Sequence, residues 1–148
     1  MSVIRPITLA DRADWGGLWQ GYLAYYKTVL PDEMYDLAFK RMLTQDDHEF
    51  NGLVAEKDGE LVGLVHYLFH RHGWKVENTC YLQDLYIAPS VRGQSIGRAL
   101  IEAVYTAADT ANAPDVYWLT QDFNKAGRRL YDRVGQLTPF IKYQRPKG

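Results

Sequence analysis

Apolar positions along this chain change period several times, which predicts alternating strands and helices. Residues 3–8 read as a short strand, and the acid three positions after Thr8 matches a helix N-terminal signature. The aromatic-rich stripe that follows recurs at i, i+3, i+4, i+7, i+8 and i+11 and predicts an amphipathic helix. Its members are Trp15, Leu18, Trp19, Tyr22, Leu23 and Tyr26. Pro31 is expected in the first turn of a second helix that runs to about residue 43.

The middle and end of the chain add five strands and two helices. Residues 52–57 and 60–70 predict a hairpin joined by Asp58-Gly59, and residues 79–87 predict a third strand of that group. Helical periodicity begins at Ile96, a strand is expected at 116–120, and Asn124 is expected to cap a helix over 125–134. A last strand is expected at 140–143. This order predicts one α/β domain spanning 1–148, a mixed sheet with helices on both faces.

Composition narrows the class of protein. The net charge of −1 gives no basic footprint for nucleic acid or an anionic membrane, and the single cysteine, Cys80, excludes an internal disulfide. No apolar run approaches membrane-spanning length and the first residues do not read as a signal peptide, so we expect a cytoplasmic protein. The 11 tyrosines and 4 tryptophans suit a pocket or a subunit interface, and we expect a homo-oligomer, most simply a dimer.

The turn at residues 92–98 joins the strand at 79–87 to the helix that begins at Ile96. It holds two glycines and two arginines beside a helix N-terminus, where free N–H groups favour a phosphate or pyrophosphate. The alternative is that the glycines only make a tight bend. The segment lacks the Gly-Lys-Ser/Thr of the P-loop and the Gly-x-Gly-x-x-Gly of dinucleotide folds.

Arg92-Gly93-Gln94-Ser95-Ile96-Gly97 resembles the Arg/Gln-x-x-Gly-x-Gly/Ala signature of the GCN5-related N-acetyltransferases, the GNAT superfamily. The resemblance implies a mixed, mostly antiparallel sheet flanked by about four helices. It also implies acetyl-coenzyme A as cofactor, with Arg92 to Gly97 and Arg98 around its pyrophosphate. The main chain of Leu85, Tyr86 and Ile87 would hydrogen-bond its pantetheine arm. Ser95 replaces the first motif glycine, and we expect it to keep a negative φ.

A second signature follows at Asn124-Lys125-Ala126-Gly127-Arg128-Arg129-Leu130-Tyr131, which resembles the family pattern Asn-x-x-(A/S)-x-x-(L/F)-Tyr. The resemblance implies that Asn124 positions the cofactor end of the site and that Tyr131 is the general acid. A phenol with a pKa near 10 stays protonated at neutral pH and can protonate a leaving thiolate. The alternative is that Tyr131 only packs on the sheet.

The general base is harder to assign. Leu82-Gln83-Asp84 resembles the Leu-Glu-Asp segment of the diamine acetyltransferase branch, but Gln83 cannot accept a proton. Asp84 is the remaining catalytic candidate, although neighbouring residues of a regular strand point to opposite faces. A water chain to Asp84, Asp122 or a tyrosine could serve instead, or the amine could arrive neutral. The segment at residues 116–124 resembles a different branch of the same superfamily, the histone and polyamine acetyltransferases.

Four residues are candidates for the acceptor site: Tyr26, Asp32, Gln83 and Asp122. Asp32 begins a helix, where it could attract a cationic substrate or only complement the helix dipole. No metal site is expected, because His66 and His70 would lie roughly 13 Å apart along a strand. Cys80 reads as a buried strand thiol.

These residues predict an N-acetyltransferase that moves the acetyl group of acetyl-coenzyme A to a primary amine. The acceptor would be a small molecule, such as a polyamine or an amino-acid-like compound, or a lysine side chain. The alternatives are a protein or peptide N-acetyltransferase and a non-catalytic acyl-coenzyme A sensor.

Overall fold

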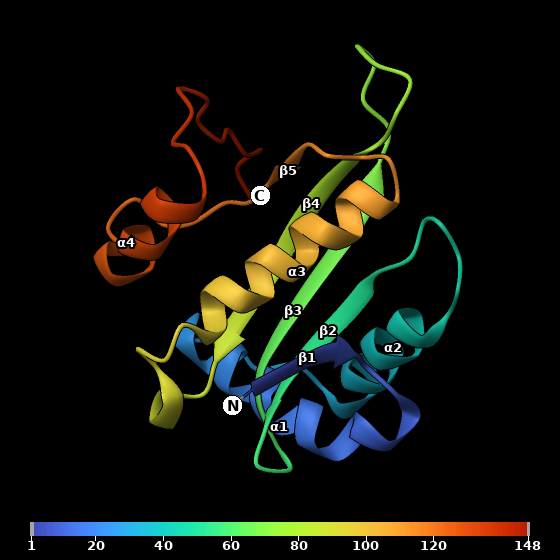
Figure 1. Ribbon diagram of the computed structural model, residues 1–148, viewed down its shortest axis with the longest axis vertical. Coiled ribbons are helices and arrows are strands. Elements are labelled where there is room, and N and C mark those ends of the chain that lie inside the picture. The colour runs from blue at the N-terminus through green and yellow to red at the C-terminus, as the bar shows by residue number, and fades with distance from the viewer. Residues whose placement is uncertain (1, 148) are drawn as a thin grey trace.

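A computed structural model describes residues 2–147 and contains a five-stranded sheet with helices on both faces (Figure 1). Two helices, α1 and α2, follow the first strand, while α3 and α4 alternate with the last two strands. The elements are β1 (Ser2–Pro6), α1 (Arg12–Tyr25), α2 (Asp32–Leu43), β2 (Asn51–Lys57), β3 (Glu60–His70), β4 (Thr79–Ile87), α3 (Ile96–Thr110), β5 (Val116–Tyr117) and α4 (Lys125–Val134). Short 3-10 turns at Leu9–Asp11 and Pro89–Val91 precede α1 and α3.

The strands lie in sequence order, β1-β2-β3-β4-β5. The first four pair antiparallel, and β5 pairs parallel to β4. The predicted mixed, mostly antiparallel sheet is therefore confirmed, together with the four flanking α-helices of the described chain.

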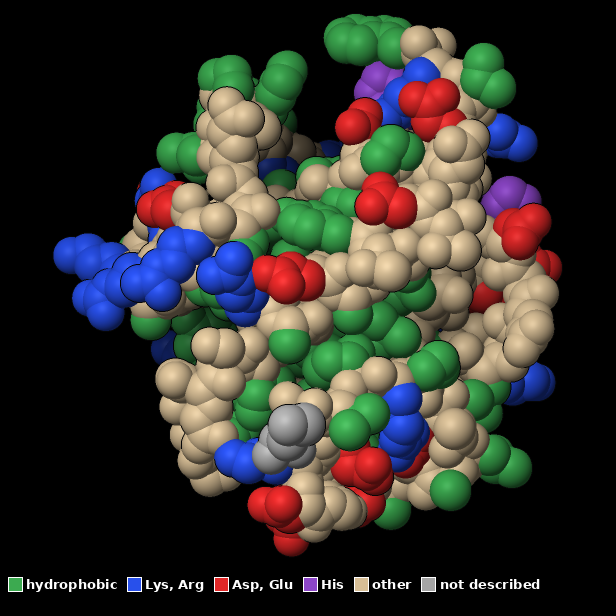
Figure 2. Space-filling view, in the orientation of Figure 1, with side chains coloured by type: hydrophobic (Ala, Val, Ile, Leu, Met, Phe, Trp, Pro, Cys, Tyr) green, Lys and Arg blue, Asp and Glu red, His purple; other side chains and the backbone are tan. Residues whose placement is uncertain are grey.

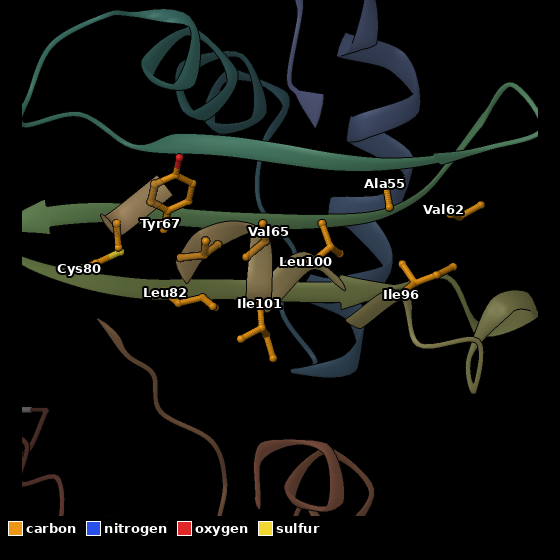
Figure 3. Packing of buried hydrophobic residues seen from close by; sticks show 11 residues of the cluster. Ala55, Val62, Val65, Tyr67, Cys80, Leu82, Ile96, Leu100 and Ile101 are labelled. Carbon is orange, nitrogen blue, oxygen red and sulfur yellow. The ribbon is translucent and has the colours of Figure 1, made fainter. Parts of the chain in front are cut away.

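Each face of the sheet is covered by its own hydrophobic cluster. On one face, Leu100 and Ile101 of α3 pack on β3 and β4 (Figure 3). Val104 of α3 belongs to the same cluster. On the other, Trp15, Trp19 and neighbours from α1 and α2 cover Val54 and Leu64. Four members of the predicted stripe, Trp15, Leu18, Trp19 and Leu23, thus form core, whereas Tyr26 is exposed.

The entry into α1 is held by a buried carboxylate. Asp11 accepts hydrogen bonds from both terminal nitrogens of Arg5, at 2.8 and 2.9 Å, and from the backbone N–H of Thr8 at 2.8 Å. The Arg5 guanidinium and these hydrogen bonds lower the pKa of Asp11 to about 2. The predicted signature at Thr8 is confirmed, and it closes the turn that leads into the helix.

A β-bulge interrupts the alternation of β4. His66 faces Asp84 across the ladder, but the next residue, Tyr67, faces Leu82, so Gln83 is the extra residue. As a result Leu82 and Leu85 pack in the α3 cluster, whereas Tyr86 packs in the α1 cluster. Simple alternation along this strand, as assumed from the sequence, is wrong at Gln83.

Several predicted boundaries are wrong. The strand expected at 116–120 ends at Tyr117, and residues 140–143 form no strand. The side chains of Phe140, Ile141 and Tyr143 are instead exposed. Pro31 precedes α2 as its N-cap, with φ −70° and ψ 158°, rather than lying in its first turn.

Candidate active site

The predicted turn between β4 and α3 presents free backbone donors. Helix α3 begins at Ile96, and its first capping bond runs from the N–H of Ala99 to the carbonyl of Ser95, at 3.1 Å. Among residues 2–147, the N–H groups of Ile96, Gly97 and Arg98 donate to no protein acceptor. A helix N-terminus with three such donors is suited to a phosphate group.

The backbone of this turn is left-handed at two positions. Gly93 has φ +83° and Ser95 has φ +64°. The expectation of a negative φ at Ser95 is therefore wrong: the serine adopts the conformation that a glycine reaches at lower cost, since an L side chain here crowds the backbone. At Gly97 the reason for a glycine is space rather than φ. A Cβ there would lie 3.1 Å from the Leu130 side chain of α4, which would have to shift.

The polar side chains of the turn have distinct partners. Arg92 donates from Nε to the carbonyl of Ile87 at 3.1 Å, and its guanidinium lies 5.5 Å from the centre of the Tyr86 ring. Gln94 accepts from Lys57 Nζ, and Arg98 pairs with Glu102 one turn along α3. Lys57, on β2, is a cation beside the turn that sequence reasoning missed, because only the fold brings it there.

Next to the turn, β4 and β5 diverge. The parallel ladder joins Cys80 to Val116 and Tyr81 to Tyr117 and then stops, so the edge of β4 from Gln83 onward has no partner in β5. This edge contains Leu85, Tyr86 and Ile87, whose main chain was predicted to hold an extended ligand. An unpaired strand edge of this kind can accept another extended chain.

A small cavity lies where the two strands separate. Its lining comes from the end of α1, from β4, from the 118–120 segment and from two helices beyond. The residues are Tyr22, Tyr26, Leu82, Gln83, Leu85, Ile101, Trp118, Leu119, Thr120 and Tyr131. Tyr26, Gln83 and Tyr131, predicted from distant parts of the sequence, are thus brought together. Tyr22 also lines the cavity, although it was not predicted as a site residue. The sequence signal that could have indicated it is its position in the same helical stripe as Tyr26.

Tyr131 is held by the local structure of α4. Asn124 caps the helix, with its side-chain oxygen accepting from the N–H of Gly127 at 3.2 Å and its amide donating to Thr120 at 3.0 Å. The ring of Tyr131 meets Trp118 edge-on, with centroids 5.6 Å apart. Burial, followed by the neighbouring Tyr26 and Tyr25, raises the pKa of Tyr131, so its hydroxyl keeps its proton at neutral pH.

Asp84 lies behind Tyr22 and does not itself line the cavity. Its side chain is 13% exposed, and Oδ2 lies 2.8 Å from Nδ1 of the buried His66. Burial and then the charge of Asp84 raise the pKa of Tyr22 above its usual range. Asp84 is thus close enough to influence the Tyr22 hydroxyl, and Tyr22 lines the cavity.

Two predicted acceptor residues lie elsewhere. Asp32 lines a separate groove between α1 and α2 with Lys27, and Asp122 is exposed outside the cavity lining. Among residues 2–147, no group of three His, Cys, Asp or Glu side chains converges on a metal position. Burial raises the pKa of Cys80 to about 12, so its thiol is not a nucleophile at neutral pH.

Basic side chains gather over α4 at the left of the molecule (Figure 2). This basic edge consists of Lys125, Arg128, Arg129 and Arg133. Within the described part of the chain, no helix has both the length and the apolar character needed to cross a bilayer.

Comparison with known proteins identifies relatives of both sequence and fold. The family model "Acetyltransferase (GNAT) family" matches residues 15–136. The D-amino-acid N-acetyltransferase HPA3 of Saccharomyces cerevisiae is 35% identical over 97% of this chain and 89% of its own. The thialysine N-epsilon-acetyltransferase of Bos taurus is 35% identical over 51% of this chain and 44% of its own.

Among solved structures, the aminoglycoside N-acetyltransferase AAC(6')-Iy in complex with coenzyme A superposes with a TM-score of 0.85 at 18% identity. The match covers 100% of this chain and 96% of that one. At this identity the likeness concerns the fold.

Proposed function

Because this chain belongs to the GNAT family of acetyltransferases, we propose that it acetylates a primary amine of a small, amino-acid-like or polyamine molecule with acetyl-coenzyme A. The observation that carries the proposal is the cavity where β4 and β5 separate, because Tyr131 lines it together with Tyr22, Tyr26 and Gln83. In this proposal residues 1–148 form a single catalytic domain. The cytoplasmic location expected from the sequence stays a prediction.

The residues present fit acetyl-coenzyme A. The free N–H groups of Ile96, Gly97 and Arg98 would hold its pyrophosphate, with Arg92 beside them. The unpaired edge of β4 at Leu85, Tyr86 and Ile87 would hold the pantetheine arm, and the basic edge of α4 would attract its phosphates. Gly93, Gln94 and Ser95 would shape the turn, and Asn124 would fix the start of α4.

When bound, acetyl-coenzyme A supplies the acetyl thioester, whose C–S bond breaks as the C–N bond to the amine forms. Tyr131 gives its phenolic proton to the leaving sulfur and regains one from solvent. The acceptor ammonium loses one proton to Asp84 through the Tyr22 hydroxyl, which gives up one proton as it takes another. The nitrogen releases its second proton to solvent as the amide forms. Gln83, on the bulge, contacts the acceptor without exchanging protons.

The cavity lining favours an ammonium over an anion. It contains tyrosines and an amide, with the carboxylate of Asp84 behind them, and its described residues include no lysine or arginine. Aromatic faces and a nearby negative charge both attract cations. The named activities of the relatives, on a D-amino acid and on thialysine, support an acceptor that carries an amino group.

The test is thiol release from acetyl-coenzyme A with a panel of polyamines, L- and D-amino acids, aminoglycosides and basic peptides. We expect Tyr131→Phe to lower turnover by more than about tenfold, as general acids typically contribute a hundredfold or more, with cofactor affinity unchanged by calorimetry. Tyr105→Phe is the matched control, because Tyr105 also packs on Trp118 but lies outside the cavity. Equal turnover of the Tyr131 variant would remove its role. Cofactor binding with no release on any amine would indicate a sensor.

We also propose that the chain forms a homodimer. The C-terminal segment exposes Leu137, Phe140, Ile141 and Tyr143, each at least 74% accessible. Apolar side chains exposed together are typical of subunit contacts. Sedimentation equilibrium of the full chain, compared with a chain ending at residue 136, tests this.

A further inference from the structure

A buried chain of three side chains ends at Asp84. The indole Nε1 of Trp15 lies 3.0 Å from Nε2 of His66, and Nδ1 of His66 lies 2.8 Å from Oδ2 of Asp84. Trp15 is fully buried and His66 is 4% exposed. The three residues come from α1, β3 and β4, so the chain exists only in the folded protein.

The chemistry of tryptophan fixes the state of this histidine. An indole N–H can only donate, so Nε2 of His66 must accept and carries no proton. A neutral imidazole has one proton, which is then on Nδ1 and is donated to Asp84. Asp84 is hydrogen-bonded by a neutral partner and keeps its full negative charge.

We propose that Trp15 and His66 are positioning residues which hold Asp84 as an uncompensated anion for the acceptor ammonium. This inference rests on the proposed acetyltransfer and deepens it. The acceptor class it implies is an amine that enters as a cation and loses its proton toward Asp84.

The function of Trp15 is to oppose protonation of His66. A doubly protonated imidazole has two donors and no acceptor, so the indole N–H would lose its partner in the core. The same proton would turn the pair into a His–Asp ion pair and cancel the charge that faces Tyr22. As long as His66 stays neutral, the Asp84 carboxylate therefore presents an uncompensated negative charge to the acceptor.

Among residues 2–147, the other groups packed around Asp84 and His66 do not neutralise the Asp84 carboxylate. Three tyrosines face the carboxylate: Tyr22 of α1, Tyr26 just after α1 and Tyr81 of β4. Their hydroxyls are neutral at physiological pH, because burial raises the pKa of each. Tyr35 of α2 lies at the edge of Trp15, and the Arg12 guanidinium lies 5.6 Å from the indole centre, on the ring rather than at the histidine. Among residues 2–147, no lysine or arginine forms an ion pair with Asp84.

Trp19 offers a matched control for Trp15. The two rings stack with centroids 5.1 Å apart, both are buried, and Nε1 of Trp19 has no hydrogen-bond partner in the described chain. Trp15→Phe and Trp19→Phe thus remove similar packing, but only the first frees Nε2 of His66. The difference between them isolates the hydrogen bond.

The experiment is the pH profile of kcat/KM between pH 5.5 and 9 for these two variants, with one acceptor amine. Without the indole N–H, a proton on Nε2 of His66 no longer costs a buried hydrogen bond. We therefore expect Trp15→Phe to lose about tenfold more kcat/KM than Trp19→Phe at pH 6, and to match it at pH 8.5. Superimposable profiles would overturn the inference.

A second pair of variants at His66 keeps the test decisive if Trp15→Phe does not fold. His66→Asn retains a donor for Asp84 and cannot titrate, so it should keep kcat/KM within about threefold of the parent. His66→Phe lacks the donor, so its kcat/KM should fall by more than about threefold. Equal loss in both would show a purely structural role.

Nitrogen-15 NMR of the His66 ring separates failure of this inference from failure of the proposed function. It should show a proton on Nδ1 and a bare Nε2 in the parent protein even if no amine is acetylated. A proton on Nε2 instead would refute the assignment.

Discussion

Gly21 of α1 lies against the Tyr86 side chain of β4, and substituting it tests how tightly the helix packs on this strand. An added Cβ would lie 2.5 Å from the hydroxyl oxygen of Tyr86 and 2.9 Å from its Cζ. A rigid ring cannot yield as a flexible side chain does, so Tyr86 or the helix must move. Overpacking of this kind costs about 1–3 kcal/mol.

Gly21→Ala also brings a gain, because alanine is favoured over glycine in a helix interior by about 1 kcal/mol. Gly17 separates the two effects: it is exposed in the same helix and a Cβ there meets nothing within 4 Å. We expect Gly17→Ala to raise Tm by about 2–4 °C. The unfolding free energy of Gly21→Ala should fall about 1–3 kcal/mol below that of Gly17→Ala.

Urea unfolding of both variants followed by tryptophan fluorescence measures the difference. Tyr86→Phe removes the nearest atom and should recover part of the loss in the Gly21→Ala background, while the main chain of β4 is unchanged. Equal stabilisation by the two alanines would refute the close approach of α1 to β4, and with it the packing that sets the position of Tyr22.

Two further predictions concern the ends of helices. Asn124→Ala should destabilise the protein by about 1 kcal/mol in urea unfolding, because the N–H of Gly127 loses its cap; Asn124→Asp, which retains the acceptor, is the control. Asp11 stabilises the fold above pH 4, since its pKa is lowered to about 2 in the native state, and this stabilisation is lost as the pH falls from 4 toward 2. Asp11→Asn should therefore be less stable at pH 7 and have a flatter stability profile between pH 4 and 2; an unchanged slope would contradict the buried ion pair.

The order of elements could be predicted because their periodicities are long and their ends are marked. The strand at 79–87 and the helix start at Ile96 are confirmed, since proline and a change of period mark the boundary. The predicted strand at 140–143 is wrong, because branched and aromatic composition shows that a segment can pair with a strand edge, not that it does so.

The site was harder to predict where it depends on register and on tertiary contacts. The bulge at Gln83 has no local sequence signal, so the relation of Gln83 to Asp84 could not be derived from alternation. His66 and Trp15 are 51 positions apart, and their hydrogen bond follows only from the packing of α1 on β3. The roles of Asp84 and Tyr131 stay predictions until the variants are measured.

The bulge gives Gln83 a freedom that its neighbours on β4 lack. Its side chain is exposed and lines the cavity, while Leu82 on one side is core and Asp84 on the other is hydrogen-bonded. Replacing an exposed side chain usually changes stability by less than about 0.5 kcal/mol. Selection can therefore vary this position to suit new acceptors without exhausting the stability margin, so that acceptor preference can diverge among descendants of one scaffold.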